Sequence, residues 1–137
     1  MAYWLMKSEP SAYSWEQLVK DGRTNWSGVR NYQAAINLKA MKVGDRAFFY
    51  HSNEGLAVVG IAEIVKTAYP DPSDPSGRFV QVDIKPVAPL KEPVTLAAIK
   101  AESKLQELKL VKQGRLSVSP VGAEEWKTIC KMGGVKG

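Results

Sequence analysis

Short apolar or alternating runs recur along the chain and predict a sheet built mainly from short strands. Leu56–Ala62 is nearly all apolar, which is typical of a buried strand. In Phe79–Ile84 apolar and polar residues alternate, so one side of that strand is expected to face water. Ser52–Gly55 supplies the turn residues of a hairpin. The predicted strands are Tyr3–Met6, Arg46–His51, Gly55–Lys66, Phe79–Ile84 and Arg115–Val121.

Apolar residues at helical spacing predict helices between and after these strands. The first helix starts with a capping-box pattern, Ser14 to Gln17, and should stop at Asp21-Gly22. The further helices are expected at Tyr32–Met41, at the stripe Ala98, Ala101, Leu105 and Leu108, and at the stretch with Trp126, Ile129 and Cys130 that ends at Gly133-Gly134. Strands that come first, with helices interleaved and at the edges, indicate an α+β class with a curved antiparallel or mixed sheet.

The stretch Tyr69–Arg78 is rich in proline and aspartate, which predicts a long turn. Because it lies between two predicted strands, we interpret it as a loop inside one domain. The 137 residues are therefore expected to form a single domain, residues 1–137. A chain of this length can bury a core without metals or disulfides.

Composition narrows the class of protein only modestly. Hydrophobic residues make up 45% and charged residues 24% of the chain, as in ordinary globular proteins. The net charge is +5, but the basic excess is spread over both halves, so it favours a nucleic-acid partner only slightly. One cysteine, no apolar run long enough for a membrane and no signal-peptide pattern lead us to expect a cytoplasmic protein without a membrane partner.

The sequence contains no pattern that requires catalysis. A single histidine, His51, and a single cysteine, Cys130, cannot build a zinc site rich in these residues. Cys130 is expected to be buried, and His51 to be a hydrogen-bonded structural residue. Phosphate-loop, nucleophile-elbow and zinc-protease motifs are missing from the sequence. We therefore expect no catalytic residue, no metal ligand and no cofactor.

Candidate binding chemistry is concentrated in the stretch W-S-G-V-R-N-Y at Trp26–Tyr32. The other tryptophans lie in apolar strands or helices, whereas Trp26 has polar neighbours, so we expect its indole at a surface cleft. An indole face can stack a base, an amide such as Asn31 can read a base edge, and Arg30 can contact a phosphate. An ordinary packed loop is the alternative interpretation of the same residues.

Several segments together resemble the EVE domain and occur in the order of that family. They are Tyr3–Pro10, Trp26–Ala34, Gly44–Ser52, Val58–Val65, Ala68–Asp71 and Arg115–Val121. The resemblance implies a PUA-like fold, a curved mixed or antiparallel β-barrel of about five to six strands with flanking helices. It also implies a relation to YTH domains, which read methylated adenine in RNA. EVE domains are associated with modified bases, notably modified cytosine in DNA, and this chain looks like a stand-alone bacterial-type member.

By this resemblance, particular residues are expected to form a pocket for a flipped base. Trp26 would be an aromatic wall, and Tyr69 a second aromatic surface. The other expected pocket residues are Ser27, Lys7, Ser8, Glu9, Asn31, Tyr32, Ser117 and Ser119. Arg30 would contact the phosphate backbone. Lys39 and Lys42 would add charge, because Ala35-Ile36 stands where the family commonly has arginine and asparagine.

The resulting hypothesis is a non-catalytic monomer that binds nucleic acid carrying a modified base. A small-ligand module for a nucleobase or nucleotide, or a protein-interaction module, remains an alternative, and affinity for oligonucleotides that does not fall with added salt would favour it. A hydrolase of modified nucleotides is another alternative. Turnover that is lost on changing Glu9 or His51 would favour the hydrolase.

Overall fold

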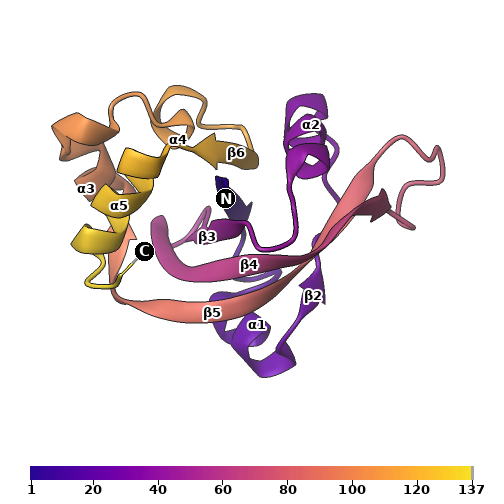
Figure 1. Ribbon diagram of the computed structural model, residues 1–137, viewed down its shortest axis with the longest axis horizontal. Helices are drawn as coiled ribbons and strands as arrows, with labels where there is room; N and C mark the ends of the chain where they lie inside the picture. The colour runs from indigo at the N-terminus through magenta and orange to yellow at the C-terminus, as the bar shows by residue number, and fades with distance from the viewer. Residues whose placement is uncertain (137) are drawn as a thin grey trace.

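The computed structural model describes residues 1–136, which form a six-stranded mixed sheet flanked by helices (Figure 1). In chain order the elements are β1 (Tyr3–Ser8), α1 (Trp15–Asp21), β2 (Thr24–Asn25), α2 (Tyr32–Ala40), β3 (Arg46–His51), β4 (Ala57–Pro70), β5 (Val80–Thr95), α3 (Leu96–Ala101), a 3-10 turn (Ser103–Leu105), α4 (Lys109–Lys112), β6 (Val118–Val121) and α5 (Ala123–Met132). The predicted α+β class with a curved mixed sheet and flanking helices is confirmed.

The sheet is curved but not closed into a barrel. Its strand order is β2-β5-β4-β3-β1-β6, and the two edge strands, β2 and β6, do not pair with each other within residues 1–136. β1 and β3 are parallel, and the other neighbouring strands are antiparallel. β4 and β5 form a long bent hairpin across the molecule, and irregularities in their register allow the bend (Figure 1).

The strand predicted over Gly55–Lys66 extends to Pro70, the strand predicted over Arg115–Val121 begins at Val118, and two further elements differ more. The predicted strand that ends at Ile84 continues as β5 to Thr95, through Pro86, Pro89 and Pro93. β2 pairs with β5 only at Asp83 and Ile84, so these prolines lie beyond it, where no further strand needs their missing N–H groups. The single helix expected over residues 98–108 is instead α3 and a 3-10 turn, and Ala98 and Ala101 are exposed.

The expectation that one side of Phe79–Ile84 faces water is wrong. Gln81 is 4% exposed and Asp83 is 9% exposed, so the polar residues of this strand are covered as well as the apolar ones. The side-chain amide of Asn25 donates to Gln81, and Arg23 and the Tyr69 hydroxyl both donate to Asp83. Each buried polar group therefore has a partner from β2, its neighbours or the end of β4.

Two hydrophobic clusters lie on opposite faces of the sheet. Phe49 belongs to the first cluster and Phe48 to the second, because neighbouring strand residues point to opposite sides. Trp15 and Trp26 meet Phe49 edge to face. Trp126 from α5 stacks on Phe48 with ring centroids 3.9 Å apart. We call these two regions the Phe49 cluster and the Phe48 cluster.

The expected helix ends and buried residues are largely confirmed. Ser14 caps α1 by accepting the backbone N–H of Gln17, and Cys130 is buried in α5. His51 is a hydrogen-bonded structural residue, since its Nε2 accepts the backbone N–H of Trp15 at 3.1 Å. None of the helices in the described chain is both long and apolar enough to cross a membrane.

Candidate functional site

A cavity of about 600 Å³ opens beside the Phe49 cluster, where the end of β1 meets the segment between β2 and α2. We call it the Trp26 cavity. Its lining combines small polar side chains, two cations, one carboxylate and aromatic surface: Lys7, Ser8, Glu9, Ala12, Tyr13, Thr24, Asn25, Trp26, Ser27, Gly28, Val29, Arg30 and Ser117. The structure thus brings together seven of the residues that the sequence selected for a base or its phosphate, namely Lys7, Ser8, Glu9, Trp26, Ser27, Arg30 and Ser117.

Trp26 is both a core residue and a wall of the cavity. Its side chain is only 9% exposed, and its ring meets Phe49 at 89° with centroids 5.6 Å apart. Its backbone N–H donates to the carbonyl of Val82 at 2.7 Å, which extends the pairing of β2 with β5. The sequence led us to expect the indole at a surface cleft and not in the core. In the structure the indole packs in the core and also lines the cavity, because it lies at the edge of the core.

A second part of the cavity wall is a tight turn after β1. The hydroxyl of Ser8 donates to the carbonyl of Tyr13 at 2.5 Å. The carbonyl of Glu9 accepts the backbone N–H groups of Ala12 and Tyr13 at 2.9 and 2.8 Å. These bonds hold the turn without using the Glu9 carboxylate, which is exposed. The wall therefore presents an acceptor that can meet an amino group.

Lys7 places a cation at the edge of the cavity. Its Nζ donates to the carbonyl of Gly114 at 2.5 Å and lies 5.9 Å from the ring centroid of Tyr50. Burial lowers the pKa of Lys7 below its usual value, because the charged form loses part of its hydration. The Lys7 ammonium is thus bonded to the protein and also lies at the edge of the cavity.

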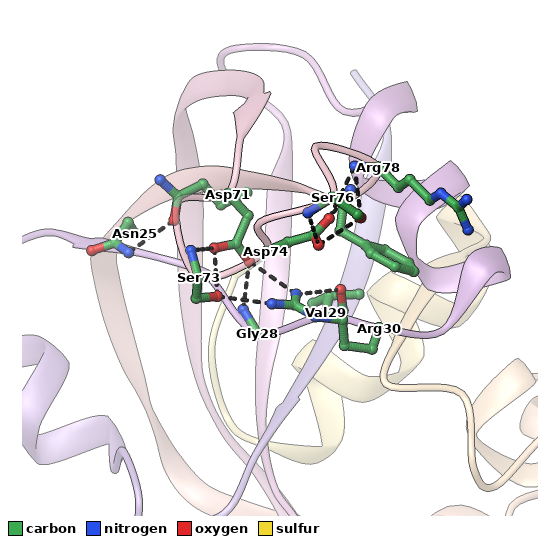
Figure 2. A network of polar contacts seen from close by, with 11 residues as sticks. Asn25, Gly28, Val29, Arg30, Asp71, Ser73, Asp74, Ser76 and Arg78 are labelled. Carbon is green, nitrogen blue, oxygen red and sulfur yellow. Dashed lines mark hydrogen bonds and ion pairs between the residues drawn. The ribbon is translucent and has the colours of Figure 1, made fainter.

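The Arg30 guanidinium is already bonded to other residues of the chain. It forms an ion pair with Asp71 at 3.2 Å, donates to the Ser73 hydroxyl at 2.9 Å and lies over the ring of Phe79 (Figure 2). The Asp71 side chain is fully buried, whereas that of Arg30 is 40% exposed. The phosphate contact of Arg30 stays a prediction, and Asp71 offsets part of the Arg30 charge.

Asp71 fastens the loop after β4 to the cavity wall. One of its oxygens accepts the backbone N–H of Gly28 at 2.8 Å, and the other accepts the N–H and hydroxyl of Ser73 (Figure 2). Burial by itself raises the pKa of Asp71, but the hydrogen bonds from Ser73, Gly28 and Arg30 outweigh it and lower the pKa to about 2. We call this set of contacts the Asp71 latch.

Asp74 organises the rest of the same loop. Its carboxylate accepts the backbone N–H groups of Ser76, Arg78 and Phe79 at 2.8 to 2.9 Å. Hydrogen bonding, led by the Ser76 hydroxyl, lowers the pKa of Asp74 to about 2. The proline-rich segment is thus an ordered loop, held internally by Asp74 and tied to the cavity by Asp71.

Six residues selected from the sequence lie outside the lining of the Trp26 cavity. Asn31 caps α2, with its side-chain oxygen accepting the N–H of Ala34 at 2.9 Å. Tyr32 is 66% exposed and packs against Phe79, and the Tyr69 hydroxyl is bonded to Asp83. Ser119 is buried in β6 opposite Leu5, and Lys39 is exposed in the last turn of α2. Lys42 is exposed beyond the end of that helix.

Other lining residues were not selected from the sequence. Asn25 and Thr24 precede Trp26, and their closeness to it was a usable signal. Tyr13 gave no such signal, because the turn after β1 brings it to the cavity. In the described part of the chain, no group of three or more His, Cys, Asp or Glu side chains could hold a metal ion. The cavity is therefore equipped for stacking and hydrogen bonding.

Comparison with known proteins places these features in a family. The EVE domain pattern matches residues 2–132. A protein from Rhodopseudomonas palustris is 62% identical and superposes with a TM-score of 0.93, covering 98% of this chain and 94% of that one. Human thymocyte nuclear protein 1 is 34% identical over 165 residues, which is 96% of this chain and 73% of the human protein.

Two structures solved with nucleic acid are also similar. The crystal structure of human THYN1 in complex with DNA containing 5-methylcytosine is 33% identical, with a TM-score of 0.93 and all of both chains covered. The YTH domain of Zygosaccharomyces rouxii MRB1, solved with N6-methyladenosine RNA, has a TM-score of 0.62 over 96% of this chain and 86% of that one. At 16% identity, the second likeness shows a shared fold.

Proposed function

The chain belongs to the EVE domain family, and from this premise we propose that it binds nucleic acid by seating one modified base, a modified cytosine in the first instance, in the Trp26 cavity. The observation that carries the proposal is a cavity of about 600 Å³ with an indole in its wall and hydrogen-bonding groups around it. The complex of human THYN1 with 5-methylcytosine DNA supports the choice of base.

The energetics of base seating fit this lining. Rotating a base out of its stack costs a few kcal/mol, and less in a single strand. Stacking on an aromatic side chain returns about 1–3 kcal/mol per base. Hydrogen bonds from the base edge supply the remainder, so polar groups are needed elsewhere in the lining. The Glu9 carboxylate and the Ser27 hydroxyl belong to residues of that lining.

The Glu9 carboxylate also favours one kind of base over another. A carboxylate accepts hydrogen bonds, and cytosine presents an amino group that can donate one. Thymine and uracil have no exocyclic amino group, so Glu9 favours cytosine over them. A methyl group on the base adds only about 1–3 kcal/mol of discrimination in an apolar slot. Modified cytosine is therefore expected to be preferred to plain cytosine by a moderate factor.

The test is a binding panel read against a pair of tryptophan variants. The ligands are single- and double-stranded DNA with plain, 5-methyl or 5-hydroxymethyl cytosine, and RNA with and without N6-methyladenosine. Trp26→Ala removes the indole, and Trp26→Phe keeps a ring against Phe49 if the alanine variant is too unstable. Trp15→Phe is the matched control, because Trp15 also meets Phe49 with centroids 5.6 Å apart but does not line the cavity.

We expect the parent protein to bind at least one modified strand more tightly than its plain counterpart. The preference should vanish in Trp26→Ala, fall in Trp26→Phe and persist in Trp15→Phe. Equal binding of modified and plain strands by the parent would refute the proposal. So would an equal loss of preference in the two phenylalanine variants, because the effect would then come from the core and not from the cavity.

A free nucleobase or nucleoside is the second candidate ligand. The observation that favours it is the neutralisation of Arg30 by Asp71, which removes a cation from the cavity rim. Binding of a polymer releases counterions and weakens steeply with salt, whereas binding of an uncharged nucleoside does not. Titrations of 5-methylcytidine and of a methylated oligonucleotide at several salt concentrations separate the two ligands.

A further inference from the structure

A second hollow lies next to the Trp26 cavity and is lined by the residues that continue two of its lining segments. It measures about 360 Å³ and is lined by Asn31, Gln33, Gln113, Gly114, Arg115 and Leu116. The segment that supplies Trp26 and Arg30 to the first cavity supplies Asn31 and Gln33 to this one. The turn that supplies Ser117 to the first supplies residues 113–116 to the second. We call the second hollow the Arg115 groove.

Lys7 connects the linings of the two hollows through its hydrogen bonds. Lys7 lines the Trp26 cavity, Gly114 lines the Arg115 groove, and the Lys7 ammonium donates to the Gly114 carbonyl at 2.5 Å. The backbone N–H of Lys7 also donates to the carbonyl of Ser117 at 2.9 Å. Lys7 of the cavity lining and Gly114 of the groove lining are therefore in direct contact, which places the two hollows next to each other.

The groove carries a cation that differs from the two in the Trp26 cavity, because Lys7 and Arg30 are both bonded to other residues of the chain. Across residues 1–136 the guanidinium of Arg115 takes part in no ion pair or hydrogen bond, and the residue is exposed. This contrasts with Arg30, whose guanidinium is occupied by Asp71 and Ser73. Gln33 and Gln113 are exposed beside Arg115 and add amide donors. A ligand that carries an anion and neighbouring polar groups fits this lining better than an apolar peptide segment does.

We propose that the Arg115 groove binds the nucleotide next to the seated base, with Arg115 as the contact to its phosphate. This inference rests on the proposed function, because it needs a polymer whose base occupies the Trp26 cavity. A guanidinium can donate two parallel hydrogen bonds to a phosphate, and the amides of Gln33 and Gln113 can reach sugar or base edges. The groove adds affinity for a strand of any sequence and leaves base choice to the cavity.

The first experiment compares ligands with and without the neighbouring nucleotide. Arg115→Gln removes the charge at an exposed position, and Lys100→Gln, on α3, is the matched control that changes net charge by the same amount. We expect Arg115→Gln to weaken binding of a single-stranded oligonucleotide with one 5-methylcytosine by about threefold or more and to lower the salt slope by about one. Its affinity for free 5-methylcytidine and its melting temperature should equal those of the parent.

The second experiment locates the phosphate. The charged phosphate on the 5′ side of the modified base, and then the one on the 3′ side, is replaced by a neutral methylphosphonate. At one of these two positions the replacement should weaken binding by the parent but have little further effect in Arg115→Gln, because the same contact is already lost. At the other position the two losses should multiply.

The results distinguish failure of this inference from failure of the proposed function. If the parent prefers the modified strand but Arg115→Gln binds it as the parent does, the groove is not used and the proposed function stands. Equal weakening by Arg115→Gln and Lys100→Gln would also overturn the inference, because only net charge would then matter. If the parent shows no preference for a modified strand, the proposed function itself is wrong.

Discussion

The two faces of the sheet solve the same packing problem in different ways. On one face Phe48 stacks on Trp126, which also stacks on Tyr3, and the helix α5 covers the pair. On the other face Phe49 meets Trp15 and Trp26, but beyond Trp26 the cover is a loop and not a helix. The Phe48 cluster is sealed by apolar contacts, whereas the Phe49 cluster ends at a cavity.

This difference shows how a small domain can hold an aromatic ring at a cavity without losing its core. Trp26 is fixed by Phe49 and by the hydrogen bond to Val82, so one side of it belongs to the interior. The loop that carries it is held by polar contacts to Asp71. Apolar side chains packed over Trp26 would fill the cavity. Hydrogen bonds can hold the loop in place and leave space beside it.

The largest expected effect of a single substitution is on the sealed face. Trp126→Ala removes a fully buried ring between Tyr3 and Phe48. Truncation of a buried aromatic residue in a packed core costs about 3–5 kcal/mol of the free energy of unfolding. Denaturant unfolding should show this loss. At low temperature, where the variant is folded, its affinity for nucleic acid should match that of the parent, and a specific loss of binding would contradict the division into two faces.

A smaller effect is expected from the Asp71 latch, but it should appear in binding as well as in stability. Asp71→Asn keeps the shape of the side chain and removes the charge that holds Gly28 and Arg30. We expect a loss of about 1.5–3 kcal/mol in the free energy of unfolding, the usual scale for hydrogen bonds to a charged group. Binding of a modified strand should weaken as well, because the loop that carries Trp26 is released.

Asp74→Asn is the matched control for the latch. Asp74 accepts hydrogen bonds from Ser76, Arg78 and Phe79 within its own loop, and none of its hydrogen bonds comes from the segment that carries Trp26. This variant should lose stability with little change in binding. If both aspartate variants bind alike, the latch does not position the cavity wall.

The latch also predicts how acid unfolds the protein. The pKa of Asp71 is about 2 in the folded chain against an ordinary value of 3.8. A lowered folded-state pKa gives stability that is fully present above the unfolded value and is lost as the pH falls towards 2. The free energy of unfolding of the parent should therefore drop between about pH 4 and pH 2. Asp71→Asn should show a shallower drop over this range, and equal slopes would argue against the latch.

The parts predicted correctly from the sequence depend on neighbouring residues. Apolar periodicity located β1, β3, α2 and α5, and the capping residue Ser14 marked the start of α1. Trp26 was selected from its polar neighbours, whereas Lys7, Ser8 and Glu9 were selected through the family resemblance, and the structure places all four in the lining of one cavity. Local pattern is enough wherever a short segment determines its own conformation.

The parts that were missed depend on contacts between distant residues. The free cation expected at Arg30 is paired with Asp71, 41 positions along the chain, and the water-facing side expected for β5 is covered by β2 and Tyr69. Both polar partners were visible in the sequence, but nothing local indicated that they would meet. The role of Asn31 was ambiguous for a different reason, because an asparagine before a helix suits a cap as well as a base edge.

The smallest expected effect is an absence of reaction at Cys130, and it tests whether the two faces open independently. Burial raises the pKa of Cys130 to about 11, with nearby Arg46 opposing the shift, and the residue is 1% exposed. Because the thiolate is the reactive form, iodoacetamide at about pH 8 should leave the folded chain unlabelled and modify it only after unfolding. Slow labelling of the folded chain would measure opening of the Phe48 cluster under α5.

The same labelling rate, measured with a modified oligonucleotide bound, tests whether the two faces are independent. If they are, the bound oligonucleotide should leave the rate unchanged. A large decrease in the rate would mean that seating a base beside Phe49 also stabilises the Phe48 cluster.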